Sequence, residues 1–256
     1  MRATLALLLA TAALPAAAQT AVGLSGDRTL VTLDLATGAA SGETEVAVEG
    51  RLLGIDVRPG TGQLIGVTDA QGVVEIDPAT GAVTEVSTLS TPLPLTDGQA
   101  VVVDFNPAAD KLRLMTGTTN HRVDVETGEV TVDTSLAFEP GDAGEAAGPT
   151  VGAAAYTNSY GKPEATEMFD IDAAGSLLQQ TSPNDGTLKT IGSLGMVPAG
   201  AVALDVATTA EGVNTAYLVA GGRLHVLDLA TGTPDAGVEI TGATEELRDL
   251  AVLPAS

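Results

Sequence analysis

The chain contains 256 residues, of which 33 are acidic and 11 basic, giving a net charge of -22 at pH 7. This excess of negative charge repels nucleic acid and anionic membrane surfaces, and it favours cations among small partners. The chain has no cysteine, which excludes a disulfide framework. Its three Phe, three Tyr and no Trp argue against a carbohydrate site built from stacked aromatic rings.

Residues 1–18 have the pattern of a secretory signal peptide. Arg2 gives a positive start, residues 5–14 form a short apolar run, and three alanines before Gln19 make a small-residue cleavage site. The run is shorter than the ~20 residues that span a bilayer, so we expect cleavage in preference to an uncleaved anchor, and no membrane span. The expected product is a single domain over residues 19–256, secreted or periplasmic.

Residues 52–89 have the pattern of four short strands separated by three turns. The expected strands are 52–57, 63–68, 73–76 and 82–88. The third turn, Asp77-Pro-Ala-Thr-Gly81, combines a Pro that fixes φ with a Gly that reaches φ > 0. Strands of this length joined by such short turns predict an antiparallel four-stranded sheet, which is one blade of a β-propeller.

The same unit recurs along the chain at a period of roughly 40–50 residues, which is typical of propellers and repeat arrays. Further copies are expected with strands at 101–105, 111–115, 121–125 and 129–133, at 150–156, 167–171, 176–180 and 187–191, and at 201–206, 215–220, 223–229 and 237–241. The pair Asp185-Gly186 is a strong hairpin signal within the copy at 150–191. Residues 138–149 are rich in turn formers and are expected to form an exposed connection between blades.

The two ends of the chain supply the strands that remain. Three are expected at the start of the mature chain, at 21–24, 29–35 and 44–48, and one at the end, at 246–253. The turn Asp34-Leu-Ala-Thr-Gly38 is repeated letter for letter at 228–232. A ring must close to remove its open edges, so these strands predict a composite blade. We therefore predict an all-β, five-bladed propeller of four-stranded antiparallel blades, with six blades as the alternative.

Four aspartates recur in the first strands of the predicted blades: Asp56, Asp104, Asp205 and Asp249, with Ala155 at the corresponding place in the remaining blade. First strands line the channel of a propeller, so the carboxylates are expected to converge near the axis. Three interpretations stay open. The aspartates accept backbone hydrogen bonds and brace the blades, they hold a cation such as Ca²⁺, or two of them serve a glycosidase.

A second set of polar residues lies at predicted strand ends and loops, where binding groups concentrate. It consists of Asn106, Arg113, Asn120, Arg122, Tyr156 and Asn158. These residues form either a binding surface or local salt bridges and turn hydrogen bonds. No zinc spacing or nucleophile elbow occurs in the sequence, and no catalytic residue is assigned.

Several segments resemble the bacterial family DUF4394, a domain of unknown function. They are VDFNPAADKLRLMTGTTNHRVDVETGEVTVD at 103–133, AAAYTNS at 153–159 and SPNDGTLKTIGSLG at 182–195. GIDVRPGTGQLIGV, at 54–67, and the C-terminal strand are similar too, so the resemblance extends over nearly all of the mature chain. It implies a secreted, propeller-like protein and transfers no catalytic residue.

Two functions follow as hypotheses. The first is a monomeric, exported binding or scaffold module, whose partner is a small molecule or an exported protein. The second is a carboxylate-based or metal-dependent hydrolase at the channel mouth. The low aromatic content and the missing nucleophile motif favour the first hypothesis.

Overall fold

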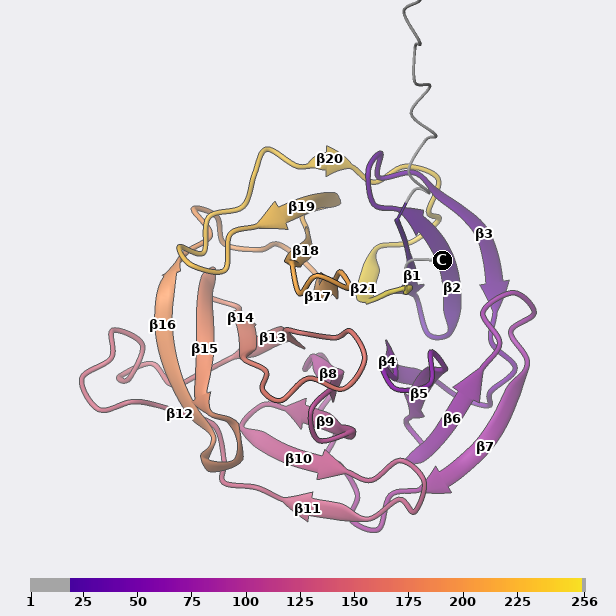
Figure 1. The fold of residues 1–256 in the computed structure, drawn as a ribbon, viewed down its shortest axis with the longest axis horizontal. Coiled ribbons are helices and arrows are strands. Elements are labelled where there is room, and N and C mark those ends of the chain that lie inside the picture. The colour runs from indigo at the N-terminus through magenta and orange to yellow at the C-terminus, as the bar shows by residue number, and fades with distance from the viewer. Residues whose placement is uncertain (1–18, 255–256) are drawn as a thin grey trace, which may run out of the picture.

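Short apolar segments and closely spaced turns fold into five sheets arranged as a ring (Figure 1). The structure is a computed structural model that describes residues 19–254, so the predicted signal peptide lies outside the described residues. The ring is a five-bladed β-propeller, which confirms the predicted fold class and blade number; the six-blade alternative is wrong. No helix in the described part of the chain is long and apolar enough to span a bilayer.

The two ends of the chain share one blade, as predicted. This terminal blade has the strand order β21-β1-β2-β3 from the axis outward. Its strands are β1 (Thr20–Ser25), β2 (Thr29–Asp34), β3 (Ala40–Glu45) and β21 (Leu247–Val252). Because β21 pairs antiparallel with β1, the last strand of the chain closes the ring.

Three further blades each follow the chain from the innermost strand to the outermost, and each is named here by its innermost strand. The β4 blade contains β4 (Leu52–Val57), β5 (Leu64–Thr68), β6 (Gly72–Ile76) and β7 (Val83–Thr88). The β8 blade contains β8 (Val101–Asn106), β9 (Lys111–Thr116), β10 (Thr119–Val123) and β11 (Val130–Val132). The β17 blade contains β17 (Val202–Thr208), β18 (Asn214–Ala220), β19 (Arg223–Leu227) and β20 (Val238–Glu239).

The β13 blade has one strand more than the predicted four. Its antiparallel strands are β13 (Val151–Tyr156), β14 (Met168–Asp172), β15 (Ser176–Ser182) and β16 (Thr187–Ser193), with the single 3₁₀ turn η1 (Pro183–Asp185) before β16. The added strand, β12 (Ala137–Phe138), pairs parallel with β16 at the outer edge. The segment expected as a plain exposed connection therefore begins inside the sheet, and Asp142 further along it accepts the Thr190 N–H at 2.8 Å.

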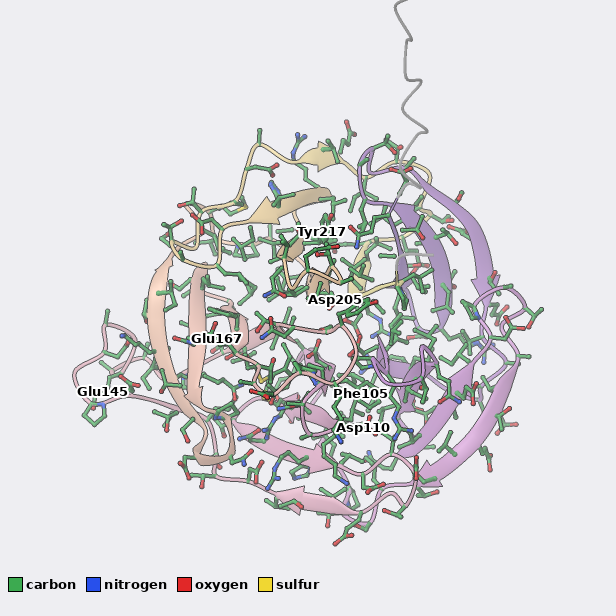
Figure 2. The ribbon with its side chains drawn as sticks, viewed as in Figure 1. Phe105, Asp110, Glu145, Glu167, Asp205 and Tyr217 are labelled. Carbon is green, nitrogen blue, oxygen red and sulfur yellow. The ribbon has the colours of Figure 1, made fainter. Side chains whose placement is uncertain are left out.

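The innermost strands are buried on both faces. Every residue of β4 is buried, whereas the outermost strand of the same blade, β7, is mostly exposed or half-buried. Neighbouring blades pack face to face, so Leu53 and Ile65 of the β4 blade lie in one apolar cluster with Phe105 and Leu114 of the β8 blade. Figure 2 labels Phe105 among the side chains of the ring. The abundance of Val, Leu and Ala follows from this packing, because inward strands have no face that turns to water.

The repeated Asp-x-x-Thr-Gly turns at 34–38, 77–81, 124–128 and 228–232 end in a glycine with φ between +71° and +75°. In three of these turns the glycine carbonyl accepts a backbone N–H from the outer part of the preceding blade, as Gly128 does from Ser90 at 2.8 Å. A Cβ atom on Gly128 would lie 2.0 Å from the Thr88 carbonyl oxygen. These turns therefore need glycine both for the left-handed backbone and for the close approach of two blades.

Candidate functional site

Three of the four predicted channel aspartates come together near the axis. Asp56 on β4, Asp104 on β8 and Asp205 on β17 are all buried, and each offers a carboxylate oxygen within 4.8 Å of the others. Each also accepts a backbone N–H from the innermost strand of the next blade. The donors are Phe105 to Asp56 at 2.6 Å, Tyr156 to Asp104 at 2.9 Å and Val252 to Asp205 at 2.5 Å. The carboxylates thus join neighbouring blades and also form a compact group of acceptor oxygens.

Burial and mutual repulsion change the protonation of this group. Burial raises the pKa of Asp56 and of Asp104 well above the usual range, and the charges of the neighbouring aspartates add to the rise. Burial also raises the pKa of Asp205, to about 6, against the lowering effect of two backbone hydrogen bonds. Three carboxyl groups at this separation cannot all be ionised at low cost without a cation, so the group either shares protons or attracts positive charge.

Asp249, the fourth predicted aspartate, lies outside this group. Its Oδ2 accepts the Ile55 N–H at 2.7 Å, and it rests against Gly54, where a Cβ atom would come within 2.7 Å of the same oxygen. Burial raises the pKa of Asp249 to about 7. Ala155 on β13 has no carboxylate, so the described residues contain no equivalent bond from β13 to β17.

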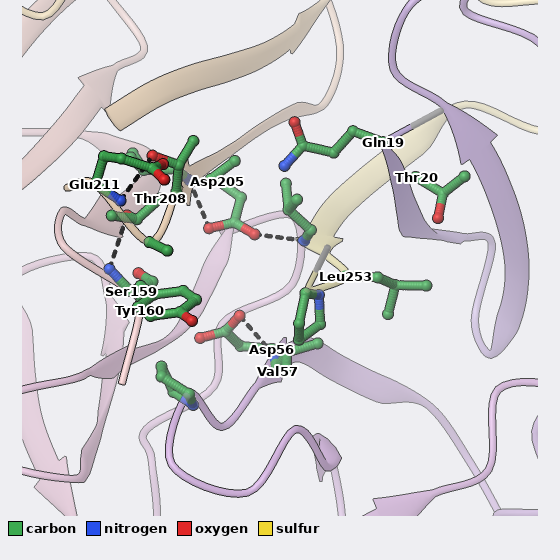
Figure 3. A pocket seen from close by; sticks show the side chains of 17 residues that line it. Gln19, Thr20, Asp56, Val57, Ser159, Tyr160, Asp205, Thr208, Glu211 and Leu253 are labelled. Atoms are coloured by element: carbon green, nitrogen blue, oxygen red, sulfur yellow. Dashed lines mark hydrogen bonds between the residues drawn. The ribbon is translucent and has the colours of Figure 1, made fainter. Parts of the chain in front are cut away.

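A cavity of about 620 Å³ opens at the end of the channel where β4, β17 and β21 finish. Asp56 and Asp205 point into it, together with Tyr160 and Ser159 from the long loop after β13 (Figure 3). Glu211 contributes a third acidic residue, and of the described residues that line the cavity none is Lys, Arg or His. The volume lies within the ~300–1,000 Å³ of small-molecule sites.

The second predicted set of polar residues divides into a network around Arg113 and two turn residues, of which Asn106 borders the network at Tyr156. Arg113, which is 1% exposed, donates to Asn120 and Asp133 at 2.7 Å each, to Asn184 at 3.0 Å and to Tyr156 at 3.2 Å. The network connects the β8 blade to the β13 blade.

Arg122 extends this network with two hydrogen bonds to Asp133, at 2.7 and 2.9 Å. These bonds hold the pKa of Asp133 below its usual range, although burial opposes them. Asn120 in turn donates to the Pro183 carbonyl at 2.8 Å. Arg113, Asn120 and Tyr156 are buried and hydrogen-bonded inside the protein, whereas the Arg122 side chain remains 33% exposed.

Asn106 borders the network of Arg113, because its side chain lies beside Tyr156, whereas Asn158 lies apart from it. Asn106 accepts the N–H groups of Ala108 and Ala109 and so caps the turn that follows β8. Asn158 has a left-handed backbone, with φ of 62°, and exchanges hydrogen bonds with Asn214 at 2.9 Å. These bonds hold the start of the long loop, and therefore Tyr160, beside the β17 blade.

The family DUF4394, described as a domain of unknown function, matches residues 29–251. The chain belongs to this family. The match covers four blades and most of the terminal blade, from which β1 is left out, and it confirms the resemblance seen in the sequence. No curated protein is similar to the chain in sequence.

Of three solved structures, one shares the fold at low sequence identity, and the other two are less similar in structure. A protein of unknown function from Bacteroides thetaiotaomicron is 16% identical with a TM-score of 0.50, over 91% of this chain and 66% of that one. The chain thus spans just under two thirds of that relative. A protein of unknown function from Bacteroides caccae is 11% identical (TM-score 0.42, 93% of this chain and 99% of that one), and a luciferin-regenerating enzyme is 12% identical (TM-score 0.49, 91% and 80%). These similarities concern the fold alone.

Sequence reasoning missed the loop side of the cavity. Ser159, Tyr160 and Glu211 follow innermost strands, Thr208 is the last residue of one, and none of them belongs to a repeated position. The available signal was the unusual length of the loop after β13, because long loops beside a rigid scaffold often contribute to binding.

Proposed function

We propose that this chain is an exported binding module that takes a cationic ligand in the cavity at the Asp56 and Asp205 end of the channel. The observation that carries the proposal is the charge of the walls. Acidic side chains line the cavity and basic ones are missing from its described lining. The pKa values of Asp56 and Asp205, which lie in this cavity, are raised. A bound cation would reduce the repulsion between their carboxylates, which are otherwise neutralised by bound protons.

A divalent cation such as Ca²⁺ is the smallest ligand of this class. Ca²⁺ takes oxygen ligands at about 2.3–2.6 Å, so oxygens on opposite sides of one ion lie at most about 5 Å apart. The separation of at most 4.8 Å among the oxygens of Asp56, Asp104 and Asp205 fits that requirement. Asp104 has only one oxygen engaged by a backbone N–H, which leaves the other for a ligand.

Calorimetric titration with Ca²⁺ tests the cation site. We expect the wild type to bind and Asp104→Asn to lose at least about tenfold in affinity, because a neutral amide replaces a charged ligand. Asp34→Asn is the control, since it removes a carboxylate from an exposed turn outside the group. Equal binding by wild type and Asp104→Asn, or none by either, would contradict the cation site.

Export is supported by the apolar leader and its small-residue cleavage site, before Gln19. Expression of the whole chain followed by cell fractionation tests this part. We expect a shortened product that begins near Gln19 outside the cytoplasm. Full-length protein retained in the cytoplasm would contradict export.

A hydrolase at the same cavity is the second candidate, favoured by Asp205. A carboxyl group with a pKa of about 6, beside other carboxyl groups and open to a cavity, can hold or accept a proton near neutral pH. A screen of glycan and ester substrates with added Ca²⁺ tests it, with Asp205→Asn as the control. Absence of turnover in the wild type would end this candidate.

A further inference from the structure

A second cavity, of about 550 Å³, lies at the opposite mouth of the channel. It is lined by residues at the starts of the innermost strands, among them Leu53 of β4, Val101 of β8 and Val202 of β17. The acidic cavity is lined instead by residues where these strands end, such as Val57 and Val252. The two cavities are therefore separate openings of one channel.

The charge of this second cavity is opposite to that of the first. Arg51 and Arg248 line it, and its described lining contains neither Asp nor Glu. This composition is unusual in a chain with 33 acidic and 11 basic residues. Apolar groups form much of the remaining wall, including Leu53, Val101 and Val202.

Arg248 is held in place by neutral partners. Its guanidinium donates to the carbonyl oxygens of Gly26 at 2.6 Å, Leu52 at 2.5 Å, Leu53 at 3.0 Å and Asp27 at 3.1 Å. Among the described residues, no carboxylate forms an ion pair with it. Burial lowers the pKa of Arg248, and the positive charge of Arg51 acts in the same direction, while Asp249 and Asp27 oppose them. The group is thus rigidly oriented without a direct counter-ion.

Arg51 differs from Arg248 in its lack of hydrogen-bond partners among the described residues. It is half-buried, and within residues 19–254 its side chain neither donates a hydrogen bond nor forms an ion pair. A guanidinium presents a planar fork of donors that matches a carboxylate, and Arg51 has this fork free. One oriented and one free guanidinium beside an apolar wall are the elements of a site for an organic anion.

We propose that the cavity lined by Arg51 and Arg248 binds a small organic anion, namely a carboxylate attached to an apolar body. The carboxylate accepts hydrogen bonds from Arg51 and neutralises the charge shared with Arg248. The apolar body lies against Leu53, Val101 and Val202. The volume suits a molecule of small-ligand size. This site is independent of the cation site, because it uses none of the same side chains.

Three sources of negative charge oppose an anion here. Asp27, Asp69 and Asp97 line a neighbouring cavity together with Arg51, and Asp27 and Asp249 also act on Arg248. The net charge of -22 acts over distance and is screened within about 8 Å at physiological salt. Glu246 acts locally, because its carboxylate lies against Gly200, which belongs to the cavity lining. Removing the Glu246 charge should therefore strengthen anion binding, whereas removing the Arg51 charge should weaken it.

Ligand-observed NMR titration with hexanoate tests the site, with hexylamine and hexanol as probes of the same apolar body. We expect hexanoate to bind in preference to both. Arg51→Gln should weaken hexanoate by about tenfold, and Glu246→Gln should strengthen it. Lys189→Gln is the matched control, because it removes the same charge from the outer strand β16 and should change nothing.

Two outcomes would overturn the proposal: equal binding of the three probes, or hexanoate affinity that is the same in wild type, Arg51→Gln and Glu246→Gln. Thermal unfolding of each variant shows whether it is folded. If Arg51→Gln is not folded, the hexanoate affinity of Glu246→Gln alone decides whether the proposal holds. Asp104→Asn should bind hexanoate as the wild type does. A negative result for Ca²⁺ binding would therefore not contradict the anion site, and a negative result for hexanoate binding would not contradict the cation site.

Discussion

At the scale of single residues, Asp170 and Gln180 form an isolated buried pair. Asp170 is completely buried on β14, and the Gln180 Nε2 donates to its Oδ1 at 3.0 Å. Oδ2 of Asp170 and Oε1 of Gln180 are both buried without a hydrogen-bond partner among the described residues. A proton on Oδ2 gives both oxygens a partner at once, because the acid O–H donates to the amide oxygen. Asp170 is therefore best described as a neutral carboxylic acid.

This assignment makes folding depend on pH with a definite sign. Burial raises the pKa of Asp170 from 3.8 to about 7 in the folded protein. The stabilisation is complete below pH 3.8 and is lost as pH rises towards 7, because the unfolded chain gives up the proton first. Asp170→Asn keeps both hydrogen bonds without a titrating proton. We expect its stability relative to the wild type to increase by about 2–3 kcal/mol between about pH 5 and pH 8 in urea unfolding.

Asp34→Asn is the control for this prediction. Hydrogen bonds from Thr37 lower the pKa of Asp34, so its contribution to stability changes only near and below the ordinary value of 3.8. Between about pH 5 and pH 8, its stability difference from the wild type should stay constant. A constant difference for Asp170→Asn as well would show that Asp170 is ionised in the folded protein.

The sequence identified some of these residues and missed others for a physical reason. The recurrence of Asp56, Asp104 and Asp205 in first strands was sufficient to bring them to the axis. Asp170 was missed because the alternation in Met168–Asp172 suggests a polar face in water, whereas both faces of β14 are covered by neighbouring blades. Alternation reports solvent exposure only where one face of a sheet is open.

At the scale of structural elements, the Asp-x-x-Thr-Gly turns fasten neighbouring blades together. Gly128 has φ of 75°, and a Cβ atom added at this position would lie 2.0 Å from the Thr88 carbonyl oxygen. We expect Gly128→Ala to cost about 3 kcal/mol of unfolding free energy, since the methyl group strains the backbone and also forces the blades apart. Urea-induced unfolding measures the loss.

Gly62→Ala separates the two causes. Gly62 has nearly the same φ, 74°, but no atom lies within 4 Å of its would-be Cβ. This variant should lose only the backbone term, about 1 kcal/mol. Equal losses in the two alanine variants would mean that the contact between blades contributes nothing.

The turn motif also marks how far sequence reasoning extends at this scale. The glycines were predicted to adopt positive φ, and they do. Their approach to the preceding blade was not predicted, because a repeat does not reveal which copies become neighbours or how closely they pack. The two-residue strand β12 was missed for a related reason: it is too short to show a period, and its partner β16 lies some fifty residues away.

At the scale of the whole molecule, counting strands at the two chain ends was enough to predict the closed ring. Each blade needs four strands, and the one strand left at the C-terminus pairs with the three left at the N-terminus. The register in which β21 pairs with β1 could not be predicted by counting strands. The pairing of β21 with β1 shifts between Leu24 and Ser25, and Asp249 lies beside Gly54 instead of joining the other three aspartates.

The last prediction concerns this closure. Strand β21 lies between β17 and β4 at the axis, where Val252 donates to Asp205 and Arg248 donates to the carbonyl oxygens of Leu52 and Leu53. Deleting residues 246–256 removes these bonds and leaves β1 as an open edge. We expect the free energy of unfolding to fall by more than about 5 kcal/mol, which is the whole stability of many domains. Calorimetry should then show no cooperative transition.

Deleting only residues 254–256 is the control, because the last strand ends at Val252 and should remain paired. Adding a synthetic peptide of residues 246–256 to the longer truncation should restore a cooperative transition, since the open edge of β1 offers unpaired backbone groups to it. Size-exclusion chromatography should show the intact chain as a monomer and the truncated chain associating through that edge. An unchanged melting temperature after the longer deletion would mean that four blades and three strands are stable without closure, and that β21 does not hold the ring together.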